Sequence, residues 1–238
     1  LDIGLIAKAF NEPVKVTGFA GGRNGDYIIK NLDNMDIDHS FVPINEETRT
    51  STRILSDYGI ETEIIERSPS LSNEEVLEFY KLYRELIRDA EIICCSGPLP
   101  SGIPEDIYRD LILMAKEENK KVFLDASGEA LKYGIKASPF LIKPNRDELE
   151  EYAGFILTNE NEIIKAANYI KENGVEIVVV SLGKAGAIVV HDEYSYKINM
   201  PSIDLVNSTG AGSAMIAGFA VSMLRNYDFE YMLKIAAA

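Results

Sequence analysis

The stretch from residue 207 to residue 219, NSTGAGSAMIAGF, has the composition of a phosphate-binding turn. Gly210 and Gly212 stand where a backbone must bend sharply, and the residues from Ser213 onward are mostly small and apolar, as in a buried helix. A glycine turn that opens into a helix leaves free N–H groups at the positive end of the helix dipole. Such a terminus is suited to phosphate. A plain junction between a loop and a core helix would show the same glycines.

A second candidate follows the apolar segment 140–142. Asn145 and Glu148 are three residues apart, so both can face one ligand from the first turn of a helix. The same spacing defines a capping box, with Asn145 as the helix cap. Taken by themselves, these two residues favour the capping box.

Polar residues also stand at predicted strand ends. Ser96 follows the apolar run 90–95, and Asp125 ends the strand that begins at Lys121. Open parallel sheets bind ligands at the carboxyl ends of their strands. Asp125 or Ser127 could equally cap the next helix.

Two arginines and one turn complete the candidates. Arg49 and Arg53 lie on short β-branched segments, and a guanidinium group binds phosphate bidentately, although a single arginine on an edge strand is more often solvated. The turn 181–186, SLGKAG, separates two apolar strands and on its own indicates a β-hairpin with flexible glycines.

Four of these motifs occur in an order that resembles one family. They are ETR at 47–49, NxxE at 145–148, SLGxxGA at 181–187 and TGAG at 209–212. The chain resembles, over nearly its whole length, the ribokinase-like (phosphofructokinase-B type) carbohydrate kinases, in the branch of 1-phosphofructokinase and tagatose-6-phosphate kinase. The resemblance implies ATP-dependent phosphoryl transfer to a hydroxyl of a phosphorylated ketohexose, with Mg²⁺.

The resemblance also implies roles for particular residues. Gly210, Ala211 and Gly212 would form the anion hole, with Ser213 at the position of the family's catalytic Asp. ATP would contact Asn145, Ser181, Gly183, Gly186 and Gly212. The sugar phosphate would contact Arg49 and Ser96, and Glu148 would act on the metal indirectly.

Departures from the family pattern leave the exact activity open. A serine hydroxyl cannot act as a base near neutral pH without a neighbour that takes its proton, so Ser213 implies either a weakened kinase or a catalytically degenerate homologue that binds nucleotide or sugar phosphate. Pro98 replaces a serine that contacts substrate phosphate in the family. The segment 66–72 also departs from the family's sequence, so the identity of the sugar stays undecided. A nicotinamide-dependent dehydrogenase is disfavoured because Gly21, Gly22 and Gly25 have the wrong spacing.

Strand and helix patterns alternate along the chain. This alternation predicts an α/β fold, a doubly wound, mostly parallel sheet flanked by helices. We expect one domain over 1–238, apparently truncated at both ends. Strands at 39–44, 48–55 and 61–66 would form an inserted β lid with a hairpin turn at 57–59. Lid edge strands make a homodimer plausible.

Composition narrows the class of protein. The 238 residues are 46% hydrophobic and carry a net charge of −14, which argues against nucleic acid and requires any anion site to be locally positive or to hold a metal. Cys94 and Cys95 are expected to be core residues of a reduced protein. The absence of a signal peptide and of a long apolar run predicts a cytoplasmic location without a membrane span. His39 and His191 are predicted to be isolated, solvated surface residues without ligand spacing.

Overall fold

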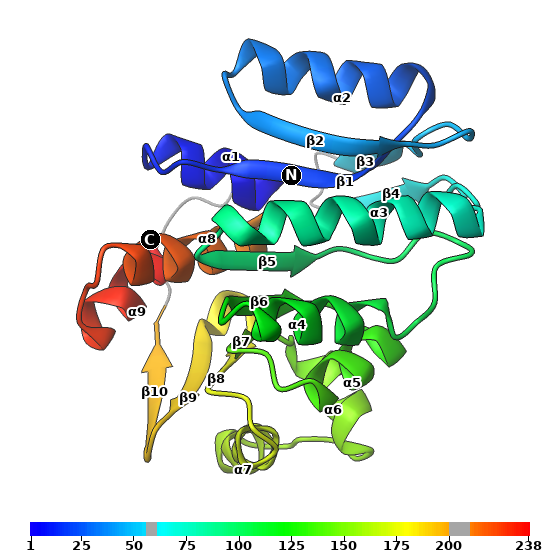
Figure 1. Cartoon of the computed structure of the whole chain (residues 1–238). Coiled ribbons are helices and arrows are strands. Elements are labelled where there is room, and N and C mark those ends of the chain that lie inside the picture. Colours follow the sequence, from blue (N-terminus) through cyan, green and yellow to red (C-terminus); the bar gives the residue numbers. More distant parts are fainter. Residues whose placement is uncertain (56–60, 200–209) are drawn as a thin grey trace. The chain divides into compact units, whose positions relative to one another are not determined.

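The computed structural model describes residues 1–55, 61–199 and 210–238. The chain divides into two compact units (Figure 1). The large unit comprises 1–13, 84–98 and 104–238, and the small unit comprises 14–83 and 99–103. Among the described residues the large unit has one sheet and the small unit has two, and each unit is described separately.

The large unit has a six-stranded sheet with the strand order β10-β9-β8-β7-β6-β5. The strands are β5 (Ile92–Ser96), β6 (Lys121–Asp125), β7 (Leu141–Ile142), β8 (Ile177–Ser181), β9 (Ala187–His191) and β10 (Tyr194–Ile198). β5 to β8 are parallel, whereas β9 and β10 each run antiparallel to the neighbour before them. The predicted mostly parallel α/β sheet is therefore confirmed, and the turn at 181–186 joins an antiparallel pair.

Helices cover both faces of this sheet (Figure 1). One layer contains α4 (Ile107–Glu117), α5 (Gly128–Lys136), α6 (Arg146–Ala153) and α7 (Glu160–Glu172), and the other contains α1 (Asp2–Ala9), α8 (Ala211–Leu224) and α9 (Phe229–Ala237). Because successive strand residues point to opposite faces, strands buried on both sides must be apolar almost throughout. β8 meets this requirement, since Ile177 to Val180 are all buried.

The predicted helix after the glycine turn is α8, and it is apolar on all sides. Its residues from Met215 to Ser222 are buried, and Ile216 and Phe219 pack with Phe123 and Val179 of the sheet. A Cβ atom on Gly218 would lie 2.8 Å from the Ala236 backbone, so α8 and α9 touch closely there. α8 is thus held on two sides by the core of the large unit.

The small unit begins with two parallel strands, β1 (Lys15–Ala20) and β2 (Asp38–Pro43), joined by α2 (Gly22–Asn34). The prediction that 39–44 belongs to the lid is therefore wrong. The crossover through α2 brings β2 alongside β1 in the parallel direction. The spacing of residues in the sequence did not show that these two strands pair. The other two predicted lid strands form the antiparallel pair β3 (Ser51–Leu55) and β4 (Glu61–Ile65), which is named the lid sheet here, and the predicted turn at 57–59 lies outside the described residues.

Most of α3 (Asn73–Leu86) also belongs to the small unit. A capping box starts this helix: the Glu75 backbone N–H donates to Ser72 Oγ (3.2 Å), and the Ser72 N–H donates to the Glu75 carboxylate (2.7 Å). The helix packs on β1 through Phe79, whose ring centroid lies 4.8 Å from that of Phe19. The box depends on two residues three apart, a spacing that is visible in the sequence.

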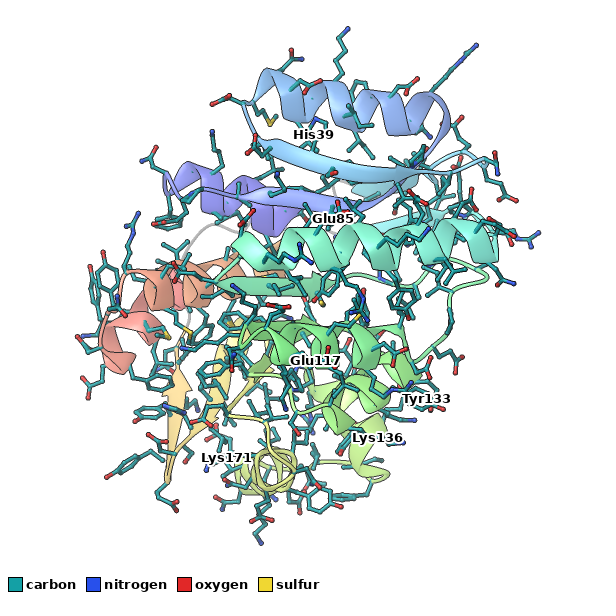
Figure 2. All side chains as sticks on the ribbon, in the orientation of Figure 1. His39, Glu85, Glu117, Tyr133, Lys136 and Lys171 are labelled. Atoms are coloured by element: carbon teal, nitrogen blue, oxygen red, sulfur yellow. The ribbon has the colours of Figure 1, made fainter. Side chains whose placement is uncertain are left out.

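The two histidines are partly buried and paired, contrary to the prediction. His39, labelled in Figure 2, lies 3.0 Å from a carboxylate oxygen of Asp33. The His191 ring is tilted against that of Phe229, with the ring centroids 4.3 Å apart, and it lies near the carboxylates of Glu176 and Asp192. Glu176 comes from the segment beside β9 rather than from nearby sequence, so spacing did not reveal it.

The two cysteines are free, as predicted, and burial raises the pKa of each thiol to about 12. In the part of the chain that the structure describes, no helix combines the length and apolarity needed to cross a bilayer.

Candidate functional site

The carboxyl ends of β5 to β8 lie along one edge of the large unit's sheet. Ser96 pairs with Asp125 in the register of β5 and β6, and Asn145 forms a parallel bridge with Ser181. The Ser181 N–H donates to the carbonyl of Pro144 (3.0 Å). Residues that were singled out separately in the sequence are therefore neighbours at one edge.

The first turn of α8 reaches the same edge. Gly210 is the N-cap residue with φ of 84°, a left-handed conformation that favours glycine. It provides no side-chain cap, and the first turn contains no acidic residue. A Cβ atom on Gly212 would lie 2.9 Å from Nζ of Lys143, which follows β7. The glycine turn and the end of β7 therefore meet.

Lys143 is a buried cation that the sequence analysis did not single out. Its side chain is 8% exposed, and its Nζ lies 3.1 Å from Oδ1 of Asp125. Asp125 is therefore engaged by a lysine, while Ser127 is the N-cap residue of α5 without a side-chain hydrogen bond. The net negative charge required a local positive group at any anion site, and this requirement could have directed attention to Lys143.

Asn145 and Glu148 form the capping box that starts α6. Asn145 Oδ1 accepts from the Glu148 N–H (2.8 Å), and Glu148 Oε2 accepts from the Asn145 N–H (2.8 Å). Burial raises the pKa of Glu148 above its ordinary value, although the Asn145 hydrogen bond and the charge of Lys143 act in the opposite direction. The box uses one oxygen of each side chain, so the other polar atom of each can still meet a ligand.

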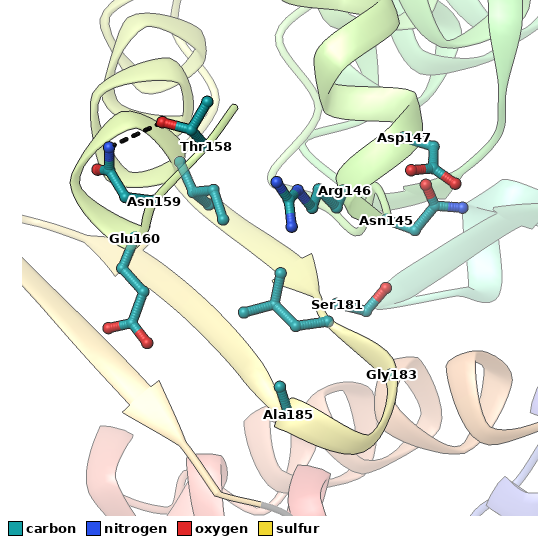
Figure 3. Close-up of a pocket in the computed structure, with 11 residues that line it drawn as sticks. Asn145, Arg146, Asp147, Thr158, Asn159, Glu160, Ser181, Gly183 and Ala185 are labelled. Carbon is teal, nitrogen blue, oxygen red and sulfur yellow. Dashed lines mark hydrogen bonds between the residues drawn. The ribbon is translucent and has the colours of Figure 1, made fainter. Parts of the chain in front are cut away.

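A cavity of about 520 Å³ opens beside this box (Figure 3). It includes Asn145, Ser181 and Gly183 from the predicted nucleotide site, and Thr158 and Asn159 from the start of α7 line the side across from them. Its volume suits a small organic ligand. Three of the five residues predicted to contact ATP thus share one cavity.

Gly186 and Gly212 do not line that cavity. Gly212 faces Lys143 instead. Gly186 has φ of 91°, and a Cβ atom there would overlap the carbonyl oxygen of Ile198. Its place in the backbone therefore requires glycine, and its contact with a nucleotide stays a prediction.

The predicted sugar-phosphate residues lie in different units. Ser96 ends β5 in the large unit, and Arg49 belongs to the small unit. Arg49 Nη1 donates to Ser68 Oγ (2.6 Å), and Arg49 lines a cavity of about 320 Å³ that also contains Arg67 and three glutamates. Arg53 is paired with Glu63 across the lid sheet (3.4 Å).

Comparison with known proteins identifies the family. The model of the pfkB family carbohydrate kinases matches residues 5–238. Tagatose-6-phosphate kinase of Staphylococcus epidermidis is 35% identical over 241 residues, which span 100% of this chain and 77% of the relative. The chain therefore belongs to the pfkB family of carbohydrate kinases.

Solved structures agree with this assignment. Phosphofructokinase-2 from Escherichia coli, in complex with substrates and products, superposes with a TM-score of 0.90 at 25% identity, covering 99% of this chain and 78% of that one. The same enzyme with fructose-6-phosphate gives 0.88 at 25% identity, with the same coverage. The predicted ribokinase-like fold and kinase class are confirmed.

Proposed function

We propose that this sugar-phosphate kinase transfers the γ-phosphoryl group of ATP to a hydroxyl of a phosphorylated ketohexose, of the fructose 1-phosphate or tagatose 6-phosphate type. One observation carries the proposal: the uncapped start of α8 meets buried Lys143 at the sheet edge that also holds Asn145 and Ser181. The match to tagatose-6-phosphate kinase supports the substrate class.

ATP is proposed to lie along Asn145, Ser181, Gly183, Gly186 and Gly212. Mg²⁺ is proposed to lie near Glu148, whose carboxylate is the kind of group that this ion prefers and would act on it indirectly. When bound, Mg²⁺ would neutralise charge on the phosphates. The amides of Ala211 and Gly212 would orient the transferred group, and Lys143 would remain paired with Asp125.

The sugar phosphate is proposed to dock on Arg49, whose guanidinium group can hold a phosphate with two parallel hydrogen bonds. Ser68 already accepts a hydrogen bond from Arg49, which orients the guanidinium group before substrate arrives. Positioning of this kind supplies most of the catalysis in phosphoryl transfer.

The proton of the attacking hydroxyl needs an acceptor, because Ser213 cannot replace the family's Asp as a base. Loss of a general base lowers the rate by roughly 10²–10⁴. Oδ2 of Asp2, on α1, lies 4.0 Å from where a Cβ on Gly210 would be, which supports Asp2 as a substitute acceptor. Asp2 also lies in the first turn of α1, where a carboxylate is stabilising by itself.

The test is ATP-dependent phosphorylation of fructose 1-phosphate, fructose 6-phosphate and tagatose 6-phosphate by the chain and by Ser213→Asp. Turnover by the unaltered chain supports a working kinase. Turnover only in Ser213→Asp favours the alternative, a degenerate homologue. A rise in melting temperature with ATP and Mg²⁺, but no turnover in either protein, leaves a binding role. If ATP and Mg²⁺ give no turnover and no rise in melting temperature in either protein, both functions are contradicted.

A homodimer through the lid strands is part of the proposal. The register pairs Thr52 with Ile64 and Ile54 with Thr62, so these four uncharged residues share one face of the β3–β4 sheet. Ile54 and Ile64 are 50% and 55% exposed. A two-stranded sheet is marginal alone. The four-residue face is defined here as the lid face, and a second copy of the same face is its proposed partner.

A further inference from the structure

Lys143 occupies a position that is unfavourable for a cation without an anion beside it. The residue is 7% exposed. Its ammonium group has three donors, and among the described residues its recorded partner is Asp125 alone. Burying a charge is costly unless its hydrogen-bonding capacity is met. The ammonium group therefore has donors available for a further acceptor.

The surroundings of the ammonium group add to this need. Its Nζ lies against the first turn of α8, 2.9 Å from the position of a Cβ on Gly212. The amino end of a helix carries about half a positive charge, and acidic side chains usually stand there. α8 has no acidic residue in its first turn. The ammonium group, already paired with Asp125, thus lies beside a second positive centre, and a further anion at this point would interact favourably with both.

The glycine turn before α2 shows a different arrangement. α2 also starts after glycines, but the Glu47 carboxylate accepts from the N–H groups of Arg23 (3.2 Å) and Asn24 (2.6 Å). The protein itself supplies the anion at that terminus. At α8 the described side chains near the terminus are Lys143, which is paired with Asp125, and Asp2, whose Oδ2 lies 4.0 Å from the position of a Cβ on Gly210. No side chain among the described residues caps this end, so a ligand phosphate can accept from its first N–H groups.

We propose that Lys143 binds the phosphoryl group as it is transferred, together with the first amides of α8, and so supplies positive charge in a protein of net charge −14. This inference rests on the proposed function. The attacking hydroxyl oxygen forms a bond to the γ-phosphorus, and the bond to the β,γ-bridging oxygen breaks, leaving its electron pair on ADP. The hydroxyl proton goes to the base, and Lys143 stays protonated while it neutralises the phosphoryl oxygens.

Asp125 and Gly212 would then be positioning residues. Asp125 holds the ammonium group in place through its 3.1 Å ion pair. Gly212 leaves the space that the end of the lysine side chain occupies. The competing explanation is a buried ion pair with a structural role alone, and such pairs add little stability in general.

The experiment compares Lys143→Met, Lys143→Arg and Gly212→Ala. Removal of one group that stabilises transition-state charge lowers kcat by about 10²–10³. We expect this loss in Lys143→Met with a smaller change in KM for ATP, and partial recovery in Lys143→Arg. Gly212→Ala keeps both charges but displaces the ammonium group, so it should also lower kcat. Lys136→Met, which removes an exposed lysine over Tyr133 (Figure 2), should leave kcat unchanged.

A second readout does not need turnover. The melting temperature is measured with inorganic phosphate against chloride at equal ionic strength, and with β,γ-imido-ATP and Mg²⁺. The unaltered chain and Lys136→Met should gain stability, and Lys143→Met should gain clearly less. If the unaltered chain is inactive, the kinetic comparison is made on the Ser213→Asp background.

The outcomes separate the two proposals. Equal kcat and equal ligand stabilisation in Lys143→Met and the unaltered chain would overturn the role of Lys143 and leave the kinase intact. No turnover and no stabilisation of the unaltered chain or of Ser213→Asp would overturn both. If Lys143→Met does not fold, normal kcat in folded Gly212→Ala and Lys143→Arg would count against the role.

Discussion

Ser213 stands in the first turn of α8, where a carboxylate would take the proton of the attacking hydroxyl. If Asp2 replaces that carboxylate, Asp2→Asn should lower kcat by about 10²-fold or more in the unaltered chain. On the Ser213→Asp background the same change should have little effect, because the base is restored. Steady-state kinetics of the four proteins measures this coupling. Asp26→Asn, on the exposed side of α2, is the matched control.

An equal effect of Asp2→Asn on both backgrounds would contradict a role as base. It would indicate that the carboxylate stabilises α1 or α8 in the same way whichever residue stands at 213.

Glu148 gives a prediction for pH. Burial raises its pKa in the folded protein, so the folded state binds this proton more tightly than the unfolded chain. Its contribution to stability is therefore full below the unfolded pKa, about 4.3, and falls as pH rises through the folded pKa. Glu148→Gln keeps an acceptor for Asn145 but cannot ionise. As the pH rises from the unfolded pKa through the folded pKa, the melting temperature of Glu148→Gln should increase relative to that of the unaltered chain.

Glu162 is the matched control with the opposite sign. Its pKa is lowered chiefly by the Thr158 backbone N–H, which donates to its carboxylate at 2.6 Å. A lowered pKa contributes stability that is present above the unfolded pKa and is lost as pH falls. Glu162→Gln should therefore lose stability at neutral pH and match the unaltered chain in acid. Parallel pH profiles for the two variants would contradict both assignments.

At the scale of elements, the lid face carries the dimer prediction. A carboxylate at Ile54 or Ile64 would be buried opposite its own symmetry copy and repelled by it. Ile54→Asp and Ile64→Asp should therefore shift the protein to monomers in sedimentation experiments. Ile65→Asp is the matched control, because Ile65 is 56% exposed but pairs with Ser51 on the other face. If all three variants sediment alike, the dimer does not use this face.

The sequence predicted elements well where local chemistry determines them. Ser72 with Glu75, and the all-round apolar run of α8, depend on neighbouring residues only. β2 was placed in the wrong sheet because its partner, β1, is separated from it by all of α2. The antiparallel pairing of β8 and β9 agrees with the hairpin that the turn at 181–186 indicated by itself.

The same limit applied to the site. Family motifs located Asn145, Ser181 and the α8 glycines, but Lys143 stayed hidden because its meaning depends on Asp125 and Gly212, which are far apart in sequence. The pairing of His191 with Glu176 was missed for the same reason.

At the scale of the whole molecule, the two units divide the proposed ligands. The predicted nucleotide contacts all belong to the large unit, whereas Arg49 belongs to the small unit. Hydrogen exchange followed by mass spectrometry can separate the binding of nucleotide from the binding of sugar phosphate, because a bound ligand raises the free energy of local opening. β,γ-imido-ATP with Mg²⁺ should slow exchange at 181–186 and at the start of α8.

The sugar phosphate should instead slow exchange around Arg49. Arg49→Met should abolish the protection at 46–50 that fructose 1-phosphate or tagatose 6-phosphate produces, while leaving the nucleotide effect on the large unit unchanged. We expect this result because the guanidinium group of Arg49 is proposed to contact the sugar phosphate and not the nucleotide. Loss of nucleotide protection in Arg49→Met would show instead that the two units bind ATP together, and the division of ligands would be wrong.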